Sequence, residues 1–513
     1  MNQRYDVVVI GGGHNGLVCA AYLARAGLSV LVLERRPVVG GAVVTEEVVP
    51  GYRFDLGASA LFLINFTNIE TDLGLERYGL RCVDIDPMFF APYPQGSHLF
   101  VWRDVDRTCE SIAAFSPKDA DAYRCFVQRW RSVVEGMIDL VRQPPSIGGI
   151  ARVLRAAPLA AARRLPWSAA RLLDETFDHP GIKGTIAAMA AQTGVPLDEP
   201  FSAIHAAFFT SYHLGGMRRP IGGAGAFSEA LASAVRAEGG TVRVDTPAIG
   251  IRLRGGRAVA VETQDETWEA RCVVSATHLH TTLSFLGHDA PALMRWRVGR
   301  LRIGNGMGVA VRCAVDSLPG YVARPGSGPQ HTALQLISPD LSTVRRALSD
   351  HRAGRLPSEP IVTAMTFSSI DGSLAPPEKH TLFLWAQYYP YDLAAGRSWD
   401  DIGDEAADAL LAHLGRYAPG VEQSVRARLV QTPTYFERVL GLPRANIVHL
   451  DVHFSQMLWL RPGIARSPWR TPVHGLYVTG ASTHPGGGVL GTPGLFAAKQ
   501  VLEDLGRGTI DLA

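Results

Sequence analysis

The chain has 513 residues, of which 47% are hydrophobic and 19% are charged, and this length allows two or more domains with substantial cores. The formal net charge of +2 gives no reason to expect a nucleic acid as partner. The sequence also contains no run of about 18 apolar residues, the length needed to span a bilayer. Six scattered cysteines without a C-x-x-C pair predict reduced thiols, no metal site and a cytoplasmic protein.

A dinucleotide-binding turn is predicted at the start of the chain. Residues 7–10 form a short apolar run, as expected for a parallel strand that is buried on both faces. A G-x-G-x-x-G pattern follows, made of Gly11, Gly13 and Gly16. The first glycine permits a tight turn, the second lets a pyrophosphate approach the main chain, and the third lets helix and strand pack closely. No secretory signal precedes this strand, which also favours a cytoplasmic location.

The elements that follow complete this unit. Residues 17–26 predict a helix that ends at Gly27, and residues 29–33 predict a second strand. Glu34 at the end of that strand can accept hydrogen bonds from ribose hydroxyls. NAD would satisfy these features as well as FAD does. Because no second unit of strand, glycine pattern and helix occurs, we expect one dinucleotide site and no separate nicotinamide domain.

Two further glycine motifs favour FAD over NAD. Gly40 and Gly41 are placed to bring main-chain amides near a phosphate. Near the C-terminus, residues 475–488 read GLYVTGASTHPGGG, so an apolar strand again runs into a glycine turn that opens toward a helix. Motifs of this kind at opposite ends of one chain are typical of a flavoprotein, in which both hold a single FAD.

Together these motifs resemble the carotenoid desaturase and ketolase group of flavoproteins, which includes the bacterial phytoene desaturases and the CrtO-type β-carotene ketolases. The chain is also similar to the pyridine nucleotide-disulfide oxidoreductase domain-containing proteins. The matching segments follow the family's order along almost the whole chain and are residues 11–20, 34–35, 40–41, 220–226 and 479–487. This match is specific for fold and cofactor, and less so for the substrate, because members act on different polyenes.

The resemblance implies an FAD site that is distributed over the motifs at both ends of the chain. Its residues would be Gly11, Gly13, His14, Asn15, Gly16, Glu34, Arg35, Gly40, Gly41, Ala42, Ala248, Gly480, Ala481, Val489 and Leu490. The N-terminal motif would hold the pyrophosphate and the adenosine ribose, and the C-terminal motif would contact the ribityl chain and the flavin pyrimidine edge. Ala248 stands where the family more often has valine, and Ala481 where related flavoproteins often have an acid.

The fold class implied is α/β: a Rossmann-type FAD-binding domain of the glutathione-reductase and amine-oxidase kind, with a discontinuous α+β substrate domain. The FAD domain would take residues 1–60, 215–285 and 470–513, and the substrate domain would take 61–214 and 286–469. The periodicity predicts helices at 119–141 and 227–238, strands at 242–244, 308–313, 361–365 and 381–387, and a β-meander at 249–274.

One segment of the substrate domain, residues 147–173, combines apolar side chains with five arginines and a tryptophan. This composition is typical of a helix at a membrane interface, of an ordinary surface helix, or of a surface that binds a partner helix. Pro158 and Pro166 favour two short helices over one long one. Lipid contact at the inner face of the membrane would let a water-insoluble substrate reach the protein from the bilayer.

Candidate catalytic residues are few, because hydride transfer to flavin N5 is largely the cofactor's own chemistry. His484 lies in the C-terminal motif, beside the expected flavin position, and His213 and Tyr388 are candidates for the same cavity. Each would either polarise or deprotonate a substrate or simply pack within the protein. The aromatic pair Phe208–Phe209 is predicted to form part of the cavity wall.

The best-supported function is desaturation of a hydrophobic, carotenoid or polyene-like substrate by hydride transfer to flavin N5. The alternatives are ketolase-type oxygenation of a carotenoid, oxidation of another hydrophobic secondary metabolite, and a non-enzymatic role like that of the Rab GDP-dissociation inhibitors. The intact glycine motifs speak against the last. Amine oxidation is disfavoured, because the chain has only four lysines and none is in a flavin-facing context. Without a nicotinamide domain, oxygen or a membrane quinone is the expected electron acceptor.

Overall fold

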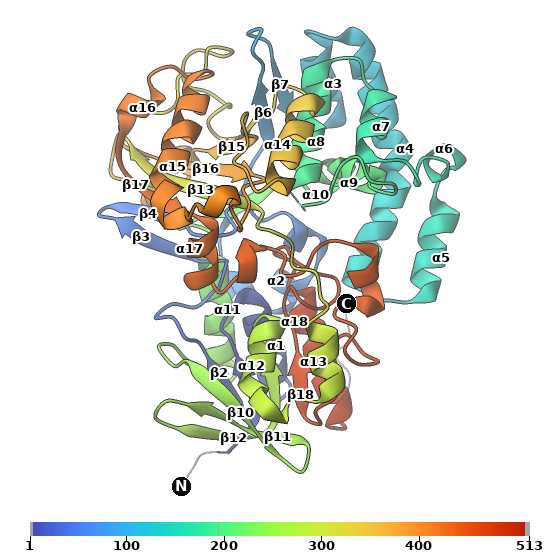
Figure 1. Ribbon diagram of the computed structural model, residues 1–513, viewed down its shortest axis with the longest axis vertical. Coiled ribbons are helices and arrows are strands. Elements are labelled where there is room, and N and C mark those ends of the chain that lie inside the picture. Colours follow the sequence, from blue (N-terminus) through green and yellow to red (C-terminus); the bar gives the residue numbers. More distant parts are fainter. Residues whose placement is uncertain (1–3, 193, 508–513) are drawn as a thin grey trace.

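The computed structural model describes residues 4–192 and 194–507, and it shows two units stacked along the long axis of the molecule (Figure 1). The lower unit in this view contains the N-terminal strand and the C-terminal helix, and the upper unit contains most of the chain between them. The outermost parts of the predicted FAD domain, 1–3 and 508–513, lie outside the described residues.

A seven-stranded sheet forms the centre of the lower unit. Its strands are β1 (Arg4–Ile10), β2 (Val30–Leu33), β9 (Thr241–Arg243), β10 (Ala248–Arg254), β11 (Arg257–Thr263), β12 (Thr267–Ser275) and β18 (Leu476–Val478). In spatial order, β18, β12, β1, β2 and β9 run parallel, while β11 and β10 extend the sheet in antiparallel fashion from the first half of β12. The carboxyl ends of β1, β2 and β12 therefore meet at one edge, which is where ligands bind in open α/β sheets.

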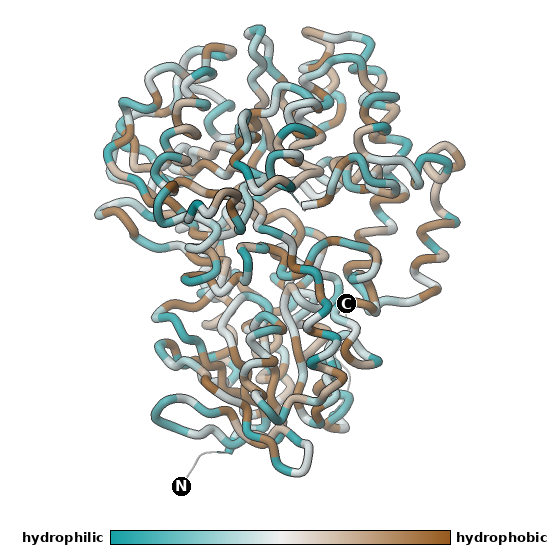
Figure 2. Tube along the Cα trace, viewed as in Figure 1, coloured by the Kyte–Doolittle hydropathy of each residue, from teal (hydrophilic) through white to brown (hydrophobic). Residues whose placement is uncertain are grey.

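Alternate residues of the central strands enter two separate hydrophobic cores. Val7 and Val9 of β1 pack against one set of helices, while Val8 and Ile10 point to the opposite side. The first set is α1 (His14–Arg25), α11 (Gly225–Ala237) and α18 (Thr492–Asp504), and the opposite side carries α12 (Leu279–Leu286) and α13 (Ala292–Val298). Because both faces are covered, these strands are continuous apolar runs, as the sequence predicts. Figure 2 shows the apolar residues gathered along them.

A second seven-stranded sheet forms the middle of the upper unit, in the order β17-β13-β16-β15-β14-β6-β7. Its strands are β6 (Phe89–Pro92), β7 (His98–Val101), β13 (Gly308–Val315), β14 (Leu334–Ile337), β15 (Val362–Met365), β16 (His380–Gln387) and β17 (Val425–Gln431). All neighbours are antiparallel except β14 and β6. Val309 and Val311 of β13 face a core that contains α15 (Trp399–Gly415) and α16 (Val421–Ser424), so the other face of the sheet is free to border a cavity.

Helices and two small two-stranded sheets complete the upper unit and the junction. The helices are α2 (Ile69–Asp72), α3 (Val105–Ala113), α4 (Pro117–Arg142), α5 (Ile147–Ala156), α6 (Leu159–Ala162), α7 (Ala169–Asp174), α8 (Pro180–Ala191), α9 (Ala203–Ala207), α10 (Ser211–Gly215), α14 (Leu341–Arg352) and α17 (Pro433–Arg438). One is the hairpin of β3 (Thr45–Val49) and β4 (Tyr52–Asp55), and the other pairs β5 (Cys82–Asp84) with the sequence-distant β8 (Arg218–Pro220) in antiparallel fashion. Among the described residues, no helix has the length and apolar character needed to cross a bilayer.

Three details differ from the sequence-based expectations. Helix α1 starts at His14, three residues earlier than predicted, because the glycine turn leads directly into it. The segment 147–173 contains three helical pieces in place of two, since Pro158 and Pro166 each interrupt the chain. Residues 61–80, which were expected in the substrate domain, supply apolar side chains to the lower core beside α1 and α11.

Candidate active site

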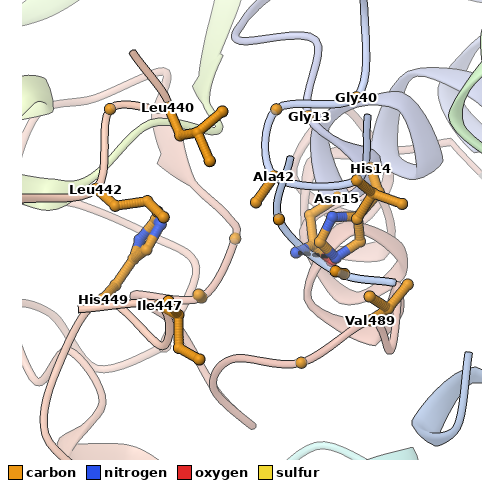
Figure 3. Close-up of a pocket in the computed structure, with 18 of the residues that line it drawn as sticks. Gly13, His14, Asn15, Gly40, Ala42, Leu440, Leu442, Ile447, His449 and Val489 are labelled. Carbon is orange, nitrogen blue, oxygen red and sulfur yellow. Dashed lines mark hydrogen bonds between the residues drawn. The ribbon is translucent and has the colours of Figure 1, made fainter. Parts of the chain in front are cut away.

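One continuous cavity of about 530 Å³ runs between the two units. Figure 3 shows its two walls: Gly13, Asn15 and Val489 lie on one side, and Leu442 and His449 face them from the other. The first wall is the edge at which the carboxyl ends of the lower parallel strands meet. The cavity therefore lies where the topology of the lower sheet predicts a ligand.

The N-terminal glycine turn supplies the anion-binding end of this cavity. Helix α1 begins directly after Gly13, so its unpaired N–H groups and the positive end of its dipole point toward the cavity. A Cβ atom on Gly16 would lie only 2.2 Å from the carbonyl oxygen of Gly11, which is why helix and turn can pack this closely only with glycine. A Cβ on Gly13 would meet no protein atom nearer than 3.9 Å, so the space above this residue is open to a ligand.

Glu34 is held in position to receive a ribose. Its side chain is only 5% exposed, and Oε2 accepts a hydrogen bond from the main-chain N–H of Gly12 at 2.7 Å. Oε1 accepts from the N–H of Arg36 at 2.9 Å. A carboxylate has about four acceptor positions, so it can still accept hydrogen bonds from hydroxyl groups. Ala248 lines the cavity at the same end.

The C-terminal motif forms the other part of the same wall. Strand β18 leads into Gly480, whose φ of +93° suits glycine, and the N–H of Thr479 donates to the carbonyl of Ser275 at the end of β12. Gly480, Ala481 and Val489 line the cavity. His14 forms a hydrogen bond with the main chain of Gly488, and its burial lowers its pKa to about 4. The two motifs, far apart in the sequence, are thus joined directly.

Fourteen of the fifteen predicted cofactor residues line this one cavity: Gly11, Gly13, His14, Asn15, Gly16, Glu34, Arg35, Gly40, Gly41, Ala42, Ala248, Gly480, Ala481 and Val489. Leu490 is the exception, since its side chain is buried in the protein and does not reach the cavity wall. Oδ1 of Asn15 is buried and has no hydrogen-bond partner among the described residues, so a ligand hydroxyl or N–H can donate to it. Donors for phosphate, a carboxylate for ribose and open space above Gly13 fit FAD.

The cavity continues from this wall onto the lower face of the upper sheet. The side chains there are mainly apolar or aromatic: Leu334, Met365, Phe383, Trp385 and Phe436. All but Phe436, which is on α17, come from the strand positions that alternate with those facing α15, so the period of the β-strand decides most of this floor. This part of the cavity thus offers mainly apolar surface.

The three predicted catalytic residues do not line the cavity, and their expected placement is corrected. The Nε2 atom of His484 lies 3.3 Å and 3.1 Å from the carbonyl oxygens of Leu140 and Gln143, at the end of α4. His484 therefore ties the C-terminal motif to the helical layer. Burial lowers its pKa to about 4, so it is neutral at pH 7.

His213 and Tyr388 are likewise used in packing. Nε2 of His213 lies 2.6 Å from the hydroxyl of Tyr123, and its Nδ1 lies 3.0 Å from the carbonyl of Arg103. Tyr388 is 3% exposed, and its hydroxyl donates to the carbonyl of Val195 at 3.4 Å. Neither residue reaches the cavity wall.

The aromatic part of the wall also differs from the expectation. Phe62 and Tyr212, stacked with ring centroids 4.2 Å apart, line the cavity in place of Phe208–Phe209. The helical turns of α10 and of the 3₁₀ segment before it point Tyr212 inward and the phenylalanine pair away. Sequence spacing alone did not distinguish these neighbouring aromatic residues.

Several polar residues of the cavity were not predicted as site residues, and His449 and Arg312 are two of them. His449 lies in a loop without periodic pattern, and its Nδ1 is 2.9 Å from Oγ of Ser482 in the C-terminal motif. Burial, together with nearby His278 and Arg461, lowers the pKa of His449 well below its usual value. Arg312 on β13 is the second, and the only signal was a charged residue within an apolar strand.

A dinucleotide cradle that opens into an apolar cavity under an antiparallel sheet defines a two-domain flavoprotein. The chain belongs to the flavin containing amine oxidoreductase family, whose model matches residues 16–295, more than half of its length. Its cofactor is FAD, as the sequence predicts, and it is an oxidoreductase.

Individual relatives agree with this assignment. The chain is 32% identical to the pyridine nucleotide-disulfide oxidoreductase domain-containing protein 2 of Mus musculus, over 98% of this chain and 94% of that protein. It is 26% identical to the phytoene desaturase (lycopene-forming) of Pantoea ananas, over 97% and 99%. The solved structure of cyclohexylamine oxidase from Brevibacterium oxydans has the same fold, with a TM-score of 0.62 and 18% identity over 98% of this chain and all of that one. The resemblance to the phytoene desaturases and to the pyridine nucleotide-disulfide oxidoreductase domain-containing proteins is thereby confirmed.

Proposed function

We propose that the protein dehydrogenates a long, apolar, polyene-like substrate that binds between the FAD site and the upper sheet. The observation that carries this proposal is the apolar floor of the cavity, which is continuous with the dinucleotide cradle. FAD supplies a two-electron acceptor at flavin N5. The likeness to a phytoene desaturase supports a substrate of the carotenoid or polyene class.

The chain's own contribution is to bind, orient and keep water away. Phe383 and Trp385 offer flat apolar surfaces on which a conjugated chain can stack. The imidazole of His449 lies on the wall opposite the glycine turn (Figure 3), and its lowered pKa keeps it neutral there. Packing of a substrate against this floor would exclude water from the reacting carbon atoms.

The charges of the cavity argue against an amine substrate. Among the described residues that line it, the only carboxylate is Glu34, at the ribose end of the cofactor site. A protonated amine would therefore have no counter-ion on the apolar floor, and burying an unpaired charge is costly. No lysine lines the described part of the cavity either.

Anaerobic reduction of the bound flavin tests this proposal directly. The FAD-loaded protein is mixed with polyenes in lipid vesicles, and the visible absorption of the oxidised flavin is followed. We expect bleaching with a carotenoid or related polyene, and none with aliphatic amines. Trp385→Ala should slow the reduction, whereas Trp296→Ala, at an exposed position of α13, should not. A flavin that amines reduce and polyenes do not would refute the proposal.

We also propose that the substrate reaches the protein from a membrane surface, through α5. This helix stands at the outer edge of the molecule, where it packs on α4 (Figure 1). Apolar and polar residues are interspersed along it (Figure 2), and its Ile147 and Leu154 are 78% and 56% exposed. Leu159, at the start of the adjoining α6, is 66% exposed. From 140 to 173 the chain has six arginines and no acid, which complements an anionic lipid surface.

Vesicle binding tests this contact. We expect the protein to sediment with vesicles that contain anionic lipid and to stay in solution with purely zwitterionic ones. Leu154→Glu should weaken the binding, while Leu293→Glu, equally exposed on α13, should not. Equal binding by both variants would contradict the role of α5.

We propose that the electron acceptor is oxygen or a membrane quinone. Reoxidation of the reduced flavin by air or by an added quinone identifies which of the two it is.

A further inference from the structure

A single buried cation faces the apolar floor of the cavity. Arg312 lies on β13 between Val311 and Cys313, whose side chains point into the core beneath α15. The alternation of the strand directs Arg312 to the opposite face, where it lines the cavity. Its side chain is 1% exposed, and the guanidinium lies 3.3 Å from the ring centroid of Phe383.

This guanidinium is not satisfied by the protein. Nε and Nη1 of Arg312 are buried, and neither has a hydrogen-bond partner among the described residues. The carboxylate of Asp55 attracts this guanidinium electrostatically, but its oxygens already accept hydrogen bonds from other residues. Oδ2 of Asp55 accepts from Arg219 at 2.5 Å, and Oδ1 accepts from Thr45 and from the N–H of Ala224.

Two other buried arginines show what this chain does with such groups elsewhere. Arg219, also 1% exposed, has an Nε without a partner too, but its Nη1 pairs with the carboxylate of Asp55 and donates to the carbonyl of Ser59. Arg461, at 2% exposure, donates to several main-chain carbonyls, among them those of Val448 and Ala481. Arg312 has neither kind of partner on its Nε and Nη1 atoms, and it is the one of the three that lines the cavity.

Burial of an unpaired charge disfavours the charged form. Desolvation lowers the pKa of Arg312 to about 9, which still leaves it protonated at neutral pH. An anion placed beside it would stabilise the charged form and accept hydrogen bonds from the guanidinium. The apolar residues around it would then bind the remainder of the same molecule.

We propose that Arg312 binds a carboxylate group of the substrate, so that the substrate is a long apolar acid rather than a pure hydrocarbon. This inference rests on the proposed function, because it takes the cavity floor to be the substrate site. A carboxylate on Arg312 would fix one end of the chain, and the apolar floor would then set which carbon atoms lie against the cofactor. Arg312 would thus determine both the substrate class and the position of oxidation.

The experiment compares decanoate with decanol, which have the same chain length and differ in the charged end. Each is titrated into the FAD-loaded protein, and binding is followed by the change in the visible flavin spectrum and by calorimetry. We expect decanoate to bind at least about tenfold more tightly than decanol. Arg312→Gln should remove this preference, and Arg312→Lys, which keeps the charge, should retain part of it.

Arg428→Gln is the matched control. Arg428 lies on the neighbouring strand β17 but pairs with Asp404 and Asp408 at the surface, so its loss should leave the preference for decanoate unchanged. Flavin content and circular dichroism verify that each variant is folded. If wild-type protein binds both ligands equally, or if Arg312→Gln keeps the preference, the inference is overturned.

Two further outcomes separate this inference from the proposed function. If Arg312→Gln shifts the reduction potential of the flavin and the wild type shows no preference for decanoate, the guanidinium serves the cofactor and the inference is refuted. If hydrocarbon polyenes bleach the flavin as well as polyene acids do, the inference falls while the proposed function stands. Preference for decanoate without bleaching by any polyene supports the anion site and refutes the dehydrogenase proposal.

Discussion

Replacing Gly13 by alanine tests whether the pyrophosphate of FAD lies above the first glycine turn. Gly13 has φ −67° and ψ 161°, which any residue adopts, and a Cβ atom here would meet no protein atom nearer than 3.9 Å. The protein itself therefore tolerates the methyl group. We expect the free energy of unfolding of the apoprotein to change by less than about 0.5 kcal/mol.

Binding of FAD should respond quite differently. The methyl group would stand where the N-terminal N–H groups of α1 reach a phosphate oxygen. Loss of one hydrogen bond to a charged group, about 1.5–3 kcal/mol, raises the Kd for FAD by about 10- to 150-fold. Gly16→Ala should instead damage the turn as well, because its Cβ would lie 2.2 Å from the oxygen of Gly11.

The assay titrates apoprotein with FAD and follows the quenching of flavin fluorescence, while urea unfolding of the apoprotein reports stability. Gly27→Ala is the control at the other end of α1. Its φ of +80° strains an alanine, at a cost of about 1 kcal/mol, but no atom lies within 4 Å and the cofactor is remote. If Gly13→Ala binds FAD as tightly as the wild type, the placement of the pyrophosphate above this turn is wrong.

Three further perturbations test the packing around the site. Asp55→Leu should lower the free energy of unfolding by about 3–5 kcal/mol, because it leaves the buried guanidinium of Arg219 without a counter-ion. Adding Arg219→Met should recover part of that loss. A double variant with a lower urea midpoint than either single variant would contradict this. The urea midpoint should decrease as the pH is lowered from 7 to 5. Burial lowers the pKa values of His14, His278 and His484 to about 4, against 6.5 when unfolded, so only the unfolded chain takes up protons in this pH range. A urea midpoint that does not change with pH would contradict this. His484→Gln should lower the melting temperature yet slow flavin reduction by less than about tenfold, whereas loss of a proton-transfer residue costs about 10²- to 10⁴-fold.

The cofactor site was predictable because its signals are local. A buried strand, a glycine turn and a helix follow one another within residues 4–25, and each glycine has a steric reason that is visible in the pattern. The same holds for residues 475–488. The order of these motifs was sufficient to predict that both ends of the chain build one FAD site, and fourteen of its fifteen residues line one cavity.

The division into domains was less accurate, and the reason is again physical. Residues 61–80 carry no glycine motif, but their apolar side chains complete the core beside α1 and α11. Which core an amphipathic segment joins depends on the surface that is left uncovered by the rest of the fold. The three helical pieces in 147–173 follow from the two prolines, because each proline interrupts the helix separately.

The sequence alone determined the fold class and the cofactor, because those depend on main-chain geometry within short segments. Only the tertiary structure decided which side chains face the substrate. His484 is 344 residues from Leu140 in the chain, and the contact between them turns its ring away from the cavity. Strand alternation directs Arg312 into the cavity, and a loop brings His449 there. Whether a buried charge such as that of Arg312 finds a partner depends on which distant parts of the chain pack against it.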